Sequence, residues 1–289
     1  MIKIGEYNRL KVLKEVDFGI YLDGGNGVEI LLPTRYVPDN TSVGDELDVF
    51  VYTDSEDRLI ATTLQPFAKV GEFAFLEVND VNSTGAFLDW GLSKDILVPY
   101  SEQKSKMIKG GLYLVYVYLD ETTKRVVASA KYEKFIGNLF PKYKRGDVVS
   151  ALIVSHDDRG YKTIVDNRYW GMIYNTDIFK NLEIGETMTA RVNQIREDGK
   201  IDLAPGADTG TRVRELAEKI YYLTDAADGH CMLNDNSTPA EIKSLLQCSK
   251  KDFKKAAGFL LKNGVITMDE KGISLIATWE DKIGSSNVT

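Results

Sequence analysis

Four lysines in the segment 250–262 are spaced so that a helix would carry them on roughly one stripe. They are Lys251, Lys254, Lys255 and Lys262, and the opposite, buried face would hold Phe253, Ala256, Ala257, Leu260 and Leu261. Such a row of ammonium groups can contact a phosphate backbone, whereas the alternative is a solvated lysine face. The stripe has no Arg, Asn or Gln to read base edges in a major groove, so sequence-specific duplex recognition is the weaker interpretation.

A second group combines aromatic rings with cations over residues 159–174. It consists of Arg159, Lys162, Tyr169, Trp170 and Tyr174, which the strand pattern places near one strand edge. Rings stack on nucleobases and cations contact phosphates, which is how single-stranded nucleic acid is held. The competing interpretation is that several of these rings belong to the core of their domain.

Residues suited to catalysis or metal binding are sparse. The chain has two cysteines, Cys231 and Cys248, and two histidines, so it offers neither a disulfide framework nor a multi-ligand zinc site. A phosphate-binding glycine-lysine loop is absent from the sequence, and acidic pairs such as Asp157-Asp158 fall in expected turns. We therefore expect no enzyme activity, no cofactor, and no catalytic or metal-binding residues.

The elements that must position these groups follow a pattern that occurs three times. In each copy a glycine is followed after 14 residues by the end of an apolar run, and after 25 residues by another glycine. The three sets are Gly19, Pro33 and Gly44; Gly85, Pro99 and Gly110; and Gly160, Tyr174 and Gly185. The first two thirds of the chain is therefore one small β module used three times.

Each copy contains five short segments with strand patterns. In the second copy they are residues 75–81, 85–89, 96–98, 112–119 and 125–129. A glycine in the second strand, where a closed sheet bends sharply, favours a five-stranded Greek-key barrel of the OB type over an open sheet. The prediction is three tandem barrels, over residues 1–66, 67–140 and 141–205.

After these barrels the period of the apolar residues changes from two to 3.6. Residues 213–223 fit a first helix, a capping box at 238–241 begins a second helix, and Ser249 begins a third. A hairpin over 265–276 completes a winged helix-turn-helix. The expected boundaries are a linker at 206–210, the winged helix at 211–280 and a tail at 281–289, so the fold class is mainly β with an α+β C-terminal domain.

The charge is unevenly distributed. The net charge of -7 argues against a simple nucleic-acid binder, because such proteins usually carry a basic excess. Residues 1–70 hold 7 basic and 12 acidic residues, whereas residues 141–205 hold 10 of each. A polyanion should favour the later modules. The sequence has no leader and no apolar run of roughly 18 to 20 residues, so we expect a cytoplasmic protein without a membrane partner.

Several strings resemble a known family. Residues 17–22 and 84–88 resemble the second strand of the S1-type RNA-binding domain, an OB barrel. More narrowly, the strings at 87–92, 95–103, 195–203 and 249–256 are similar to those of the bacterial CvfB/YitL family. This resemblance implies three S1-type modules, a C-terminal winged helix, and RNA binding linked to post-transcriptional control of gene expression.

The S1 pattern also implies which residues contact RNA. It has two rings flanking the strand-two glycine, a histidine at the end of strand three, and an acidic then a basic residue at the last hairpin. It implies Phe18, Tyr21, Asp54 and Arg58 in the first barrel; Phe87, Asp120 and Arg125 in the second; and Tyr174 and Lys200 in the third. Pro33 and Pro99 replace the histidine and Thr84 replaces one ring, so no copy has the full set. We expect at least one barrel to be structural or to bind another ligand.

Together these observations favour a non-enzymatic protein that binds single-stranded RNA by stacking and phosphate contacts, with the ribosome or RNA-processing proteins as further partners. Two alternatives stay open. One is a protein-interaction scaffold that docks on the ribosome or a nuclease. The other is a DNA-binding regulator that acts through the winged helix and prefers duplex.

Overall fold

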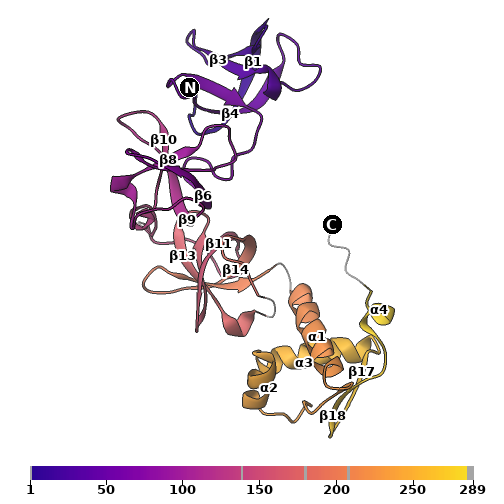
Figure 1. Ribbon diagram of the computed structural model, residues 1–289. Coiled ribbons are helices and arrows are strands. Elements are labelled where there is room, and N and C mark those ends of the chain that lie inside the picture. The colour runs from indigo at the N-terminus through magenta and orange to yellow at the C-terminus, as the bar shows by residue number, and fades with distance from the viewer. Residues whose placement is uncertain (1, 138, 179–180, 207–208, 285–289) are drawn as a thin grey trace. The chain divides into compact units, whose positions relative to one another are not determined.

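The computed structural model describes residues 2–137, 139–178, 181–206 and 209–284. It contains three closed five-stranded barrels and a C-terminal winged helix, which confirms the expected fold class (Figure 1). The chain divides into two compact units: Met1–Asn138 holds the first two barrels, and Leu139–Thr289 holds the third barrel and the winged helix. The expected linker at 206–210 and tail at 281–289 lie partly outside the described residues.

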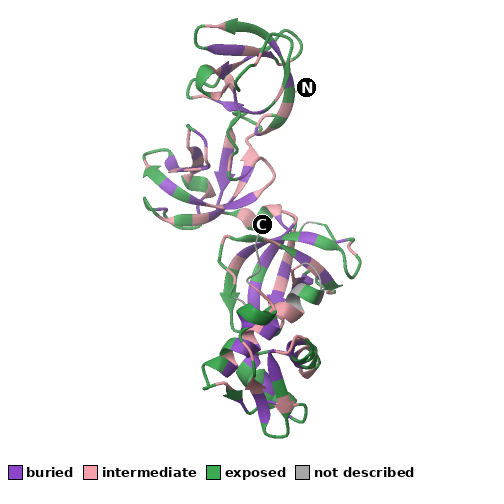
Figure 2. Cartoon of the chain, turned by 90° about the vertical axis from the view of Figure 1, so that its right-hand side faces the viewer, coloured by how far each residue is buried: buried purple, intermediate pink, exposed green. Residues whose placement is uncertain are grey.

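The three barrels share one strand order, in which the third strand pairs in parallel with the fifth. Barrel 1 consists of β1 Glu6–Val16, β2 Gly19–Asp23, β3 Glu29–Pro33, β4 Glu46–Thr53 and β5 Leu59–Thr62. Barrel 2 consists of β6 Phe73–Val81, β7 Gly85–Leu88, β8 Ile96–Pro99, β9 Leu112–Leu119 and β10 Val126–Ser129. Barrel 3 consists of β11 Val148–Asp157, β12 Gly160–Val165, β13 Tyr169–Tyr174, β14 Thr187–Ile195 and β15 Ile201–Pro205. Buried positions recur along these strands between exposed ones, as Figure 2 shows.

The 14-residue spacing of the repeat is a cross-strand register. Gly19 pairs with Pro33, Gly85 with Pro99 and Gly160 with Tyr174. At each glycine a Cβ atom would lie only 2.1 to 2.3 Å from a main-chain carbonyl oxygen of the neighbouring strand. The second strand therefore needs glycine at the point where it comes closest to the third.

The 25-residue spacing has a different cause. Gly44, Gly110 and Gly185 have φ angles of 102°, 75° and 92°, which favour glycine. Each main-chain N–H donates to a carbonyl of the first strand of its barrel, at 2.8 to 2.9 Å. The accepting carbonyls belong to residues Val12, Val78 and Ile153, where the register of the first strand shifts. The glycine turn thus begins the fourth strand at the bulge of the first.

Barrels 1 and 2 share a core. Phe50 and Tyr52 of β4 meet Trp90 of barrel 2 edge to face, with ring centroids 5.7 and 6.1 Å apart, and Trp90 is only 2 % exposed. Lys94 Nζ donates to the carbonyl oxygens of Thr53 and Asp54 at 3.1 and 2.6 Å. Burial lowers the pKa of Lys94. Trp90 therefore belongs to a core and not to a binding surface.

The C-terminal domain forms the expected helices and wing. Its elements are α1 Thr209–Asp225, β16 His230–Cys231, α2 Pro239–Leu246, α3 Lys250–Lys262, β17 Ile266–Asp269, β18 Gly272–Leu275 and α4 Trp279–Lys282. The capping box of α2 is present, with Thr238 accepting from Glu241 N–H and Glu241 accepting from Thr238 N–H. Helices α1 and α3 cross in the core of the domain (Figure 1). None of the described helices is long and apolar enough to cross a membrane.

Two elements of this domain differ from the expected three helices and two-stranded wing. The sheet has three strands in the order β16-β18-β17, and α4 follows the wing. Strand β16 is only two residues long and α4 only four, so neither leaves a periodic signal in the sequence.

Candidate nucleic-acid interface

On barrel 1 the two expected rings lie together. Phe18 follows β1 in the turn to β2 and is 58 % exposed, and its ring meets that of Tyr21 edge to face with centroids 6.3 Å apart. Lys14 Nζ lies 4.8 Å from the centroid of the Tyr21 ring and forms an ion pair of 2.6 Å with Glu29. This outer face of β1 and β2 thus presents a ring that can stack on a base beside a cation.

The expected acidic and basic residues of barrel 1 pair with each other. The Asp54 carboxylate accepts the main-chain N–H groups of Glu56 and Arg58, and it forms an ion pair with the Arg58 guanidinium at 2.7 Å. The hydrogen bond from Arg58 to Asp54 raises the pKa of Arg58. Asp54 is therefore first a turn residue that fixes the loop, and it neutralises part of the charge that Arg58 offers to a phosphate.

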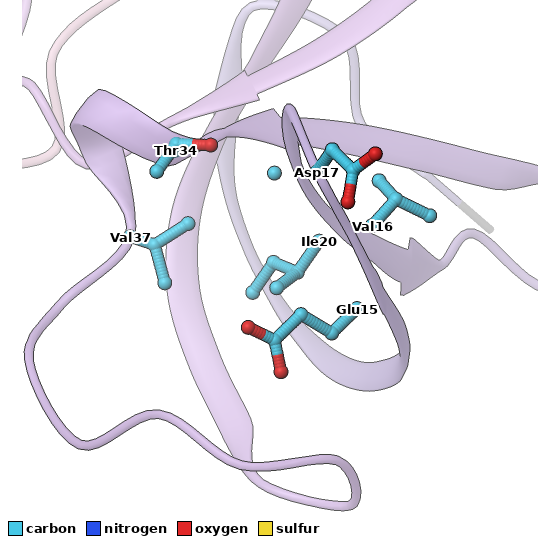
Figure 3. Close-up of a pocket in the computed structure, with 7 residues that line it drawn as sticks. Glu15, Val16, Asp17, Ile20, Thr34 and Val37 are labelled. Atoms are coloured by element: carbon cyan, nitrogen blue, oxygen red, sulfur yellow. The ribbon is translucent and has the colours of Figure 1, made fainter.

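A hollow of about 440 Å³ opens at the start of β2, lined by Glu15, Val16, Asp17, Gly19, Ile20, Thr34 and Val37. Figure 3 shows Ile20 between the carboxyl groups of Glu15 and Asp17. The lining contains two carboxylates and no cation, so it suits a cationic or apolar group better than a phosphate.

On barrel 2 the expected residues are spread over different surroundings. Phe87 is half-buried on β7, with Leu97 opposite it on β8. Arg125 donates to the carboxylate of Asp57 in barrel 1, and this hydrogen bond lowers the pKa of Asp57. Asp120 accepts the main-chain N–H groups of the next turn, which lowers its pKa. Arg125 thus links the two barrels.

Barrel 2 also carries a ring cluster that sequence reasoning missed. The rings of Tyr116 and Phe135 stack with centroids 4.1 Å apart, and Tyr118 lies 5.5 Å from Phe135. Lys134 Nζ lies 5.0 Å from the Phe135 ring and pairs with Glu102 at 2.8 Å. Burial raises the pKa of Tyr118 to about 12. The alternation of tyrosines along β9 is the signal that could have revealed this cluster.

The expected residues of barrel 3 fall on two sides of the sheet. Lys162 Nζ lies 3.7 Å above the ring of Trp170, and the two face outward from β12 and β13. Tyr169 packs against the barrel core beside Tyr143, with ring centroids 5.7 Å apart. Arg159 is well exposed and pairs with Asp157 at 3.1 Å, as Lys200 does with Asp198 at 2.6 Å. The structure therefore brings Lys162 and Trp170 together and places Tyr169 with the core.

The last expected residue of barrel 3, Tyr174, belongs to a network that sequence reasoning also missed. Arg196 forms an ion pair with Asp202 at 2.6 Å and donates to the Tyr174 hydroxyl. Gln194 Nε2 donates to the other Asp202 oxygen at 2.9 Å. Gln194 at the end of β14 and Arg196 just after it are a weak signal on their own, because only the register of β15 shows that they meet one acid.

On the winged helix, α3 places the lysine stripe at the surface. Lys251, Lys254, Lys255 and Lys262 are all exposed, and Lys254 pairs with Asp235 at 3.4 Å. Leu261 was expected on the buried face but is 40 % exposed, because Leu260 takes the core position. The tip of the wing carries Asp269, Glu270 and Lys271, and its net negative charge disfavours insertion of this wing into a nucleic-acid groove.

The barrels and the winged helix place this chain in a class of proteins built from S1 domains and a winged-helix domain. The S1 domain family matches residues 4–64 and 70–131, and the CvfB-like winged helix domain matches residues 218–275. The first two barrels are therefore S1 nucleic-acid-binding domains; barrel 3 shares their strand order and glycine landmarks. Neither matched family is a catalytic one. Among the described residues, no three His, Cys, Asp or Glu side chains are placed to hold a metal ion.

The chain belongs to the CvfB/YitL family. It is 30 % identical over 280 residues to the uncharacterized protein YitL of Bacillus subtilis, which covers 91 % of this chain and 90 % of that protein. It is 25 % identical over 263 residues to conserved virulence factor B of Staphylococcus saprophyticus, covering 88 % of both chains. A multidomain protein with nucleic acid binding domains from Streptococcus pneumoniae aligns over 94 % of this chain and 98 % of its own, with 24 % identity and a TM-score of 0.42.

Proposed function

We propose that this protein binds single-stranded RNA without catalysing a reaction, and that it acts in the cytoplasm in post-transcriptional control of gene expression. The observation that carries the proposal is the exposed ring of Phe18, held edge to face by Tyr21 with Lys14 alongside, on the outer face of an S1 domain. A ring held in this way can stack on any base, and a nearby cation can meet the phosphate. Modest sequence preference is the expected result.

The winged helix supplies a second contact in this proposal. The lysine stripe of α3 is exposed, and its side chains are long enough to follow a phosphate backbone. Single strands are favoured over duplex because the wing is acidic at Asp269 and Glu270 and the stripe lacks groups that read base pairs.

The test is a titration of a labelled single-stranded RNA oligonucleotide at several salt concentrations. On single strands, each neutralised phosphate contributes roughly -0.7 to the slope of the logarithm of the binding constant against the logarithm of the salt concentration. The triple variant Lys251→Gln, Lys254→Gln and Lys255→Gln should therefore bring this slope closer to zero by about 2. Lys271→Gln with Lys282→Gln, two exposed lysines of the same domain outside α3, is the matched control. A flat salt response of the unaltered protein, or no binding at low salt, contradicts the proposal.

A second candidate is a protein-interaction scaffold. The hollow at the start of β2 favours it for barrel 1, because the carboxylates of Glu15 and Asp17 flank an apolar floor that suits a basic peptide segment. The two functions are separated by Glu15→Gln with Asp17→Asn. If this double variant keeps or gains RNA affinity but loses a ribosomal or nuclease partner in a pull-down, the hollow is a binding site for a protein.

A further inference from the structure

Barrel 3 differs in kind from barrels 1 and 2 at four equivalent positions. The residue paired with the strand-two glycine is Pro33 and Pro99 in the first two barrels and Tyr174 in the third. The cross-strand pair of the fourth and fifth strands is Tyr52 with Ile60, Tyr118 with Val127, and Gln194 with Asp202. The residue whose N–H closes the last hairpin is Asp54, Asp120 and Arg196.

These four positions lie on the outer face of the barrel. The neighbours of Asp202 along β15, Ile201 and Leu203, point into the core, so Asp202 points outward. In barrel 1 the equivalent Tyr52 and Ile60 pack against barrel 2. In barrel 3 a polar cluster occupies the positions that form this apolar contact surface in barrel 1.

The cluster is built around one nearly buried carboxylate. Asp202 is 7 % exposed, and its Oδ1 accepts from Arg196 Nε at 2.7 Å and from the Tyr174 hydroxyl at 3.3 Å, while Arg196 Nη2 forms an ion pair with it at 2.6 Å. Its Oδ2 accepts from Gln194 Nε2 at 2.9 Å. The acid is therefore fully engaged within the cluster, and its effect is to fix the orientation of Arg196 and Gln194.

Arg196 has N–H donors that the cluster does not use. Its side chain is 31 % exposed, and its guanidinium carbon lies 5.8 Å from the centroid of the Tyr174 ring. Nε and Nη2 are used on Asp202 and Tyr174, whereas Nη1 makes no hydrogen bond to any described residue. Two N–H donors on Nη1 are thus held beside an aromatic ring, with little side-chain entropy left to lose on binding.

We propose that Tyr174, Arg196, Asp202 and Gln194 form a site for one nucleotide of a single strand, in which Arg196 Nη1 donates to a nucleotide oxygen, the Tyr174 ring supports the base, and Asp202 is the positioning residue. The proposal rests on the proposed RNA binding and assigns part of it to barrel 3. The accepting oxygen belongs to a phosphate or to a keto group of the base, and both sources present the same acceptor to the guanidinium.

The direction in which RNA affinity changes on replacing Asp202 distinguishes a positioning role from a purely electrostatic one. If its carboxylate acted only as a negative charge, Asp202→Asn would strengthen binding to a polyanion. If it positions Arg196, Asp202→Asn releases the guanidinium and weakens binding. We expect Arg196→Gln to weaken binding of a single-stranded RNA by about tenfold, since a hydrogen bond to a charged group is lost. Asp202→Asn should weaken it by about threefold or more, and the double variant should be no weaker than Arg196→Gln alone.

Two matched controls share the barrel. Asp198→Asn removes an exposed acid of the same hairpin, which pairs with Lys200, and should leave binding equal or tighter. Arg145→Gln removes an exposed arginine in the turn before β11 and should change affinity little. Thermal unfolding of every variant shows which of them have kept the fold. If Asp202→Asn has lost the fold, the affinity of Arg196→Gln alone tests the proposal.

Oligo-uridine and oligo-adenosine of equal length separate the two oxygen sources, because adenine has no keto group. An equal loss on both oligonucleotides in Arg196→Gln assigns Nη1 to a phosphate, and a loss confined to oligo-uridine assigns it to the base. Unchanged affinity in Arg196→Gln, or tighter binding in Asp202→Asn, overturns this inference while RNA binding by the other surfaces stands. No binding by the unaltered protein overturns the proposed function itself.

Discussion

Gly160 lies directly opposite Tyr174 across the β12–β13 ladder, and a Cβ atom on Gly160 would meet the main-chain carbonyl oxygen of Ile173 at 2.1 Å. The φ angle of Gly160 is 154°, which side-chain-bearing residues rarely adopt. The same close approach recurs at Gly19 and Leu32. The glycine thus allows the second strand of each barrel to bend onto the third.

Gly160→Ala should therefore destabilise barrel 3 by about 2 kcal/mol or more, because the neighbour that must move is backbone. Gly258→Ala on α3 is the matched control: a Cβ there meets nothing within 4 Å, and alanine is the better helix former. The control should stabilise its domain by up to about 1 kcal/mol. Urea unfolding measures both, and a similar shift in the two variants would show that the close approach is not what requires glycine.

The exposed ring of Phe18 gives a prediction about binding without a change in stability. Phe18→Ala should weaken single-stranded RNA binding by about 1 to 3 kcal/mol, since one stacking contact is lost. The melting temperature should change little because the ring is mostly in solvent. Phe67→Ala removes a ring of similar exposure from the link between barrels 1 and 2 and should leave affinity unchanged. Equal losses in both variants would argue for unspecific apolar contact.

The rings between barrels 1 and 2 give a prediction about coupling. Trp90→Ala should lower the free energy of unfolding by about 3 to 5 kcal/mol, because the ring fills the core shared with Phe50 and Tyr52. Differential scanning calorimetry should then show separate transitions for the two barrels. Leu112→Ala, at an exposed position of β9, should stay within about 0.5 kcal/mol of the unaltered protein. A single transition of ordinary midpoint in Trp90→Ala would contradict a shared core.

Much of the fold could be predicted because its determinants are local. The glycines at 14- and 25-residue offsets mark a close approach and a turn whose chemistry only glycine satisfies, and the capping box at Thr238 and Glu241 is complete within four residues. Strand β16 could not be predicted, because its existence depends on pairing with β18, more than 40 residues away along the chain.

The candidate site was harder to predict because its contacts cross between strands. The position of Arg125 in the S1 pattern predicts that it lies at a binding surface, whereas in the fold it donates to Asp57 of barrel 1. Asp202 carries no recognisable signal, since its partners Gln194 and Arg196 become neighbours only through the β14–β15 register. Tyr169 and Trp170 are adjacent in sequence, but the alternation of β13 sends one toward the core and the other outward.

The ionisation of Cys248 should make the stability of the winged-helix domain depend on pH. Burial raises the pKa of this thiol from 9.0 to about 11, so the folded chain keeps its proton where the unfolded chain loses it. Stability from this group is fully present below pH 9 and is lost as the pH rises toward 11, by up to about 3 kcal/mol. Cys248→Ala should be less stable at pH 8, yet its free energy of unfolding should fall less steeply between pH 9 and 11. Urea unfolding of both proteins at several pH values measures the difference in slope, which cancels the titration of the lysines and tyrosines common to both. Parallel curves over this range would mean that the thiol ionises as readily in the fold as outside it.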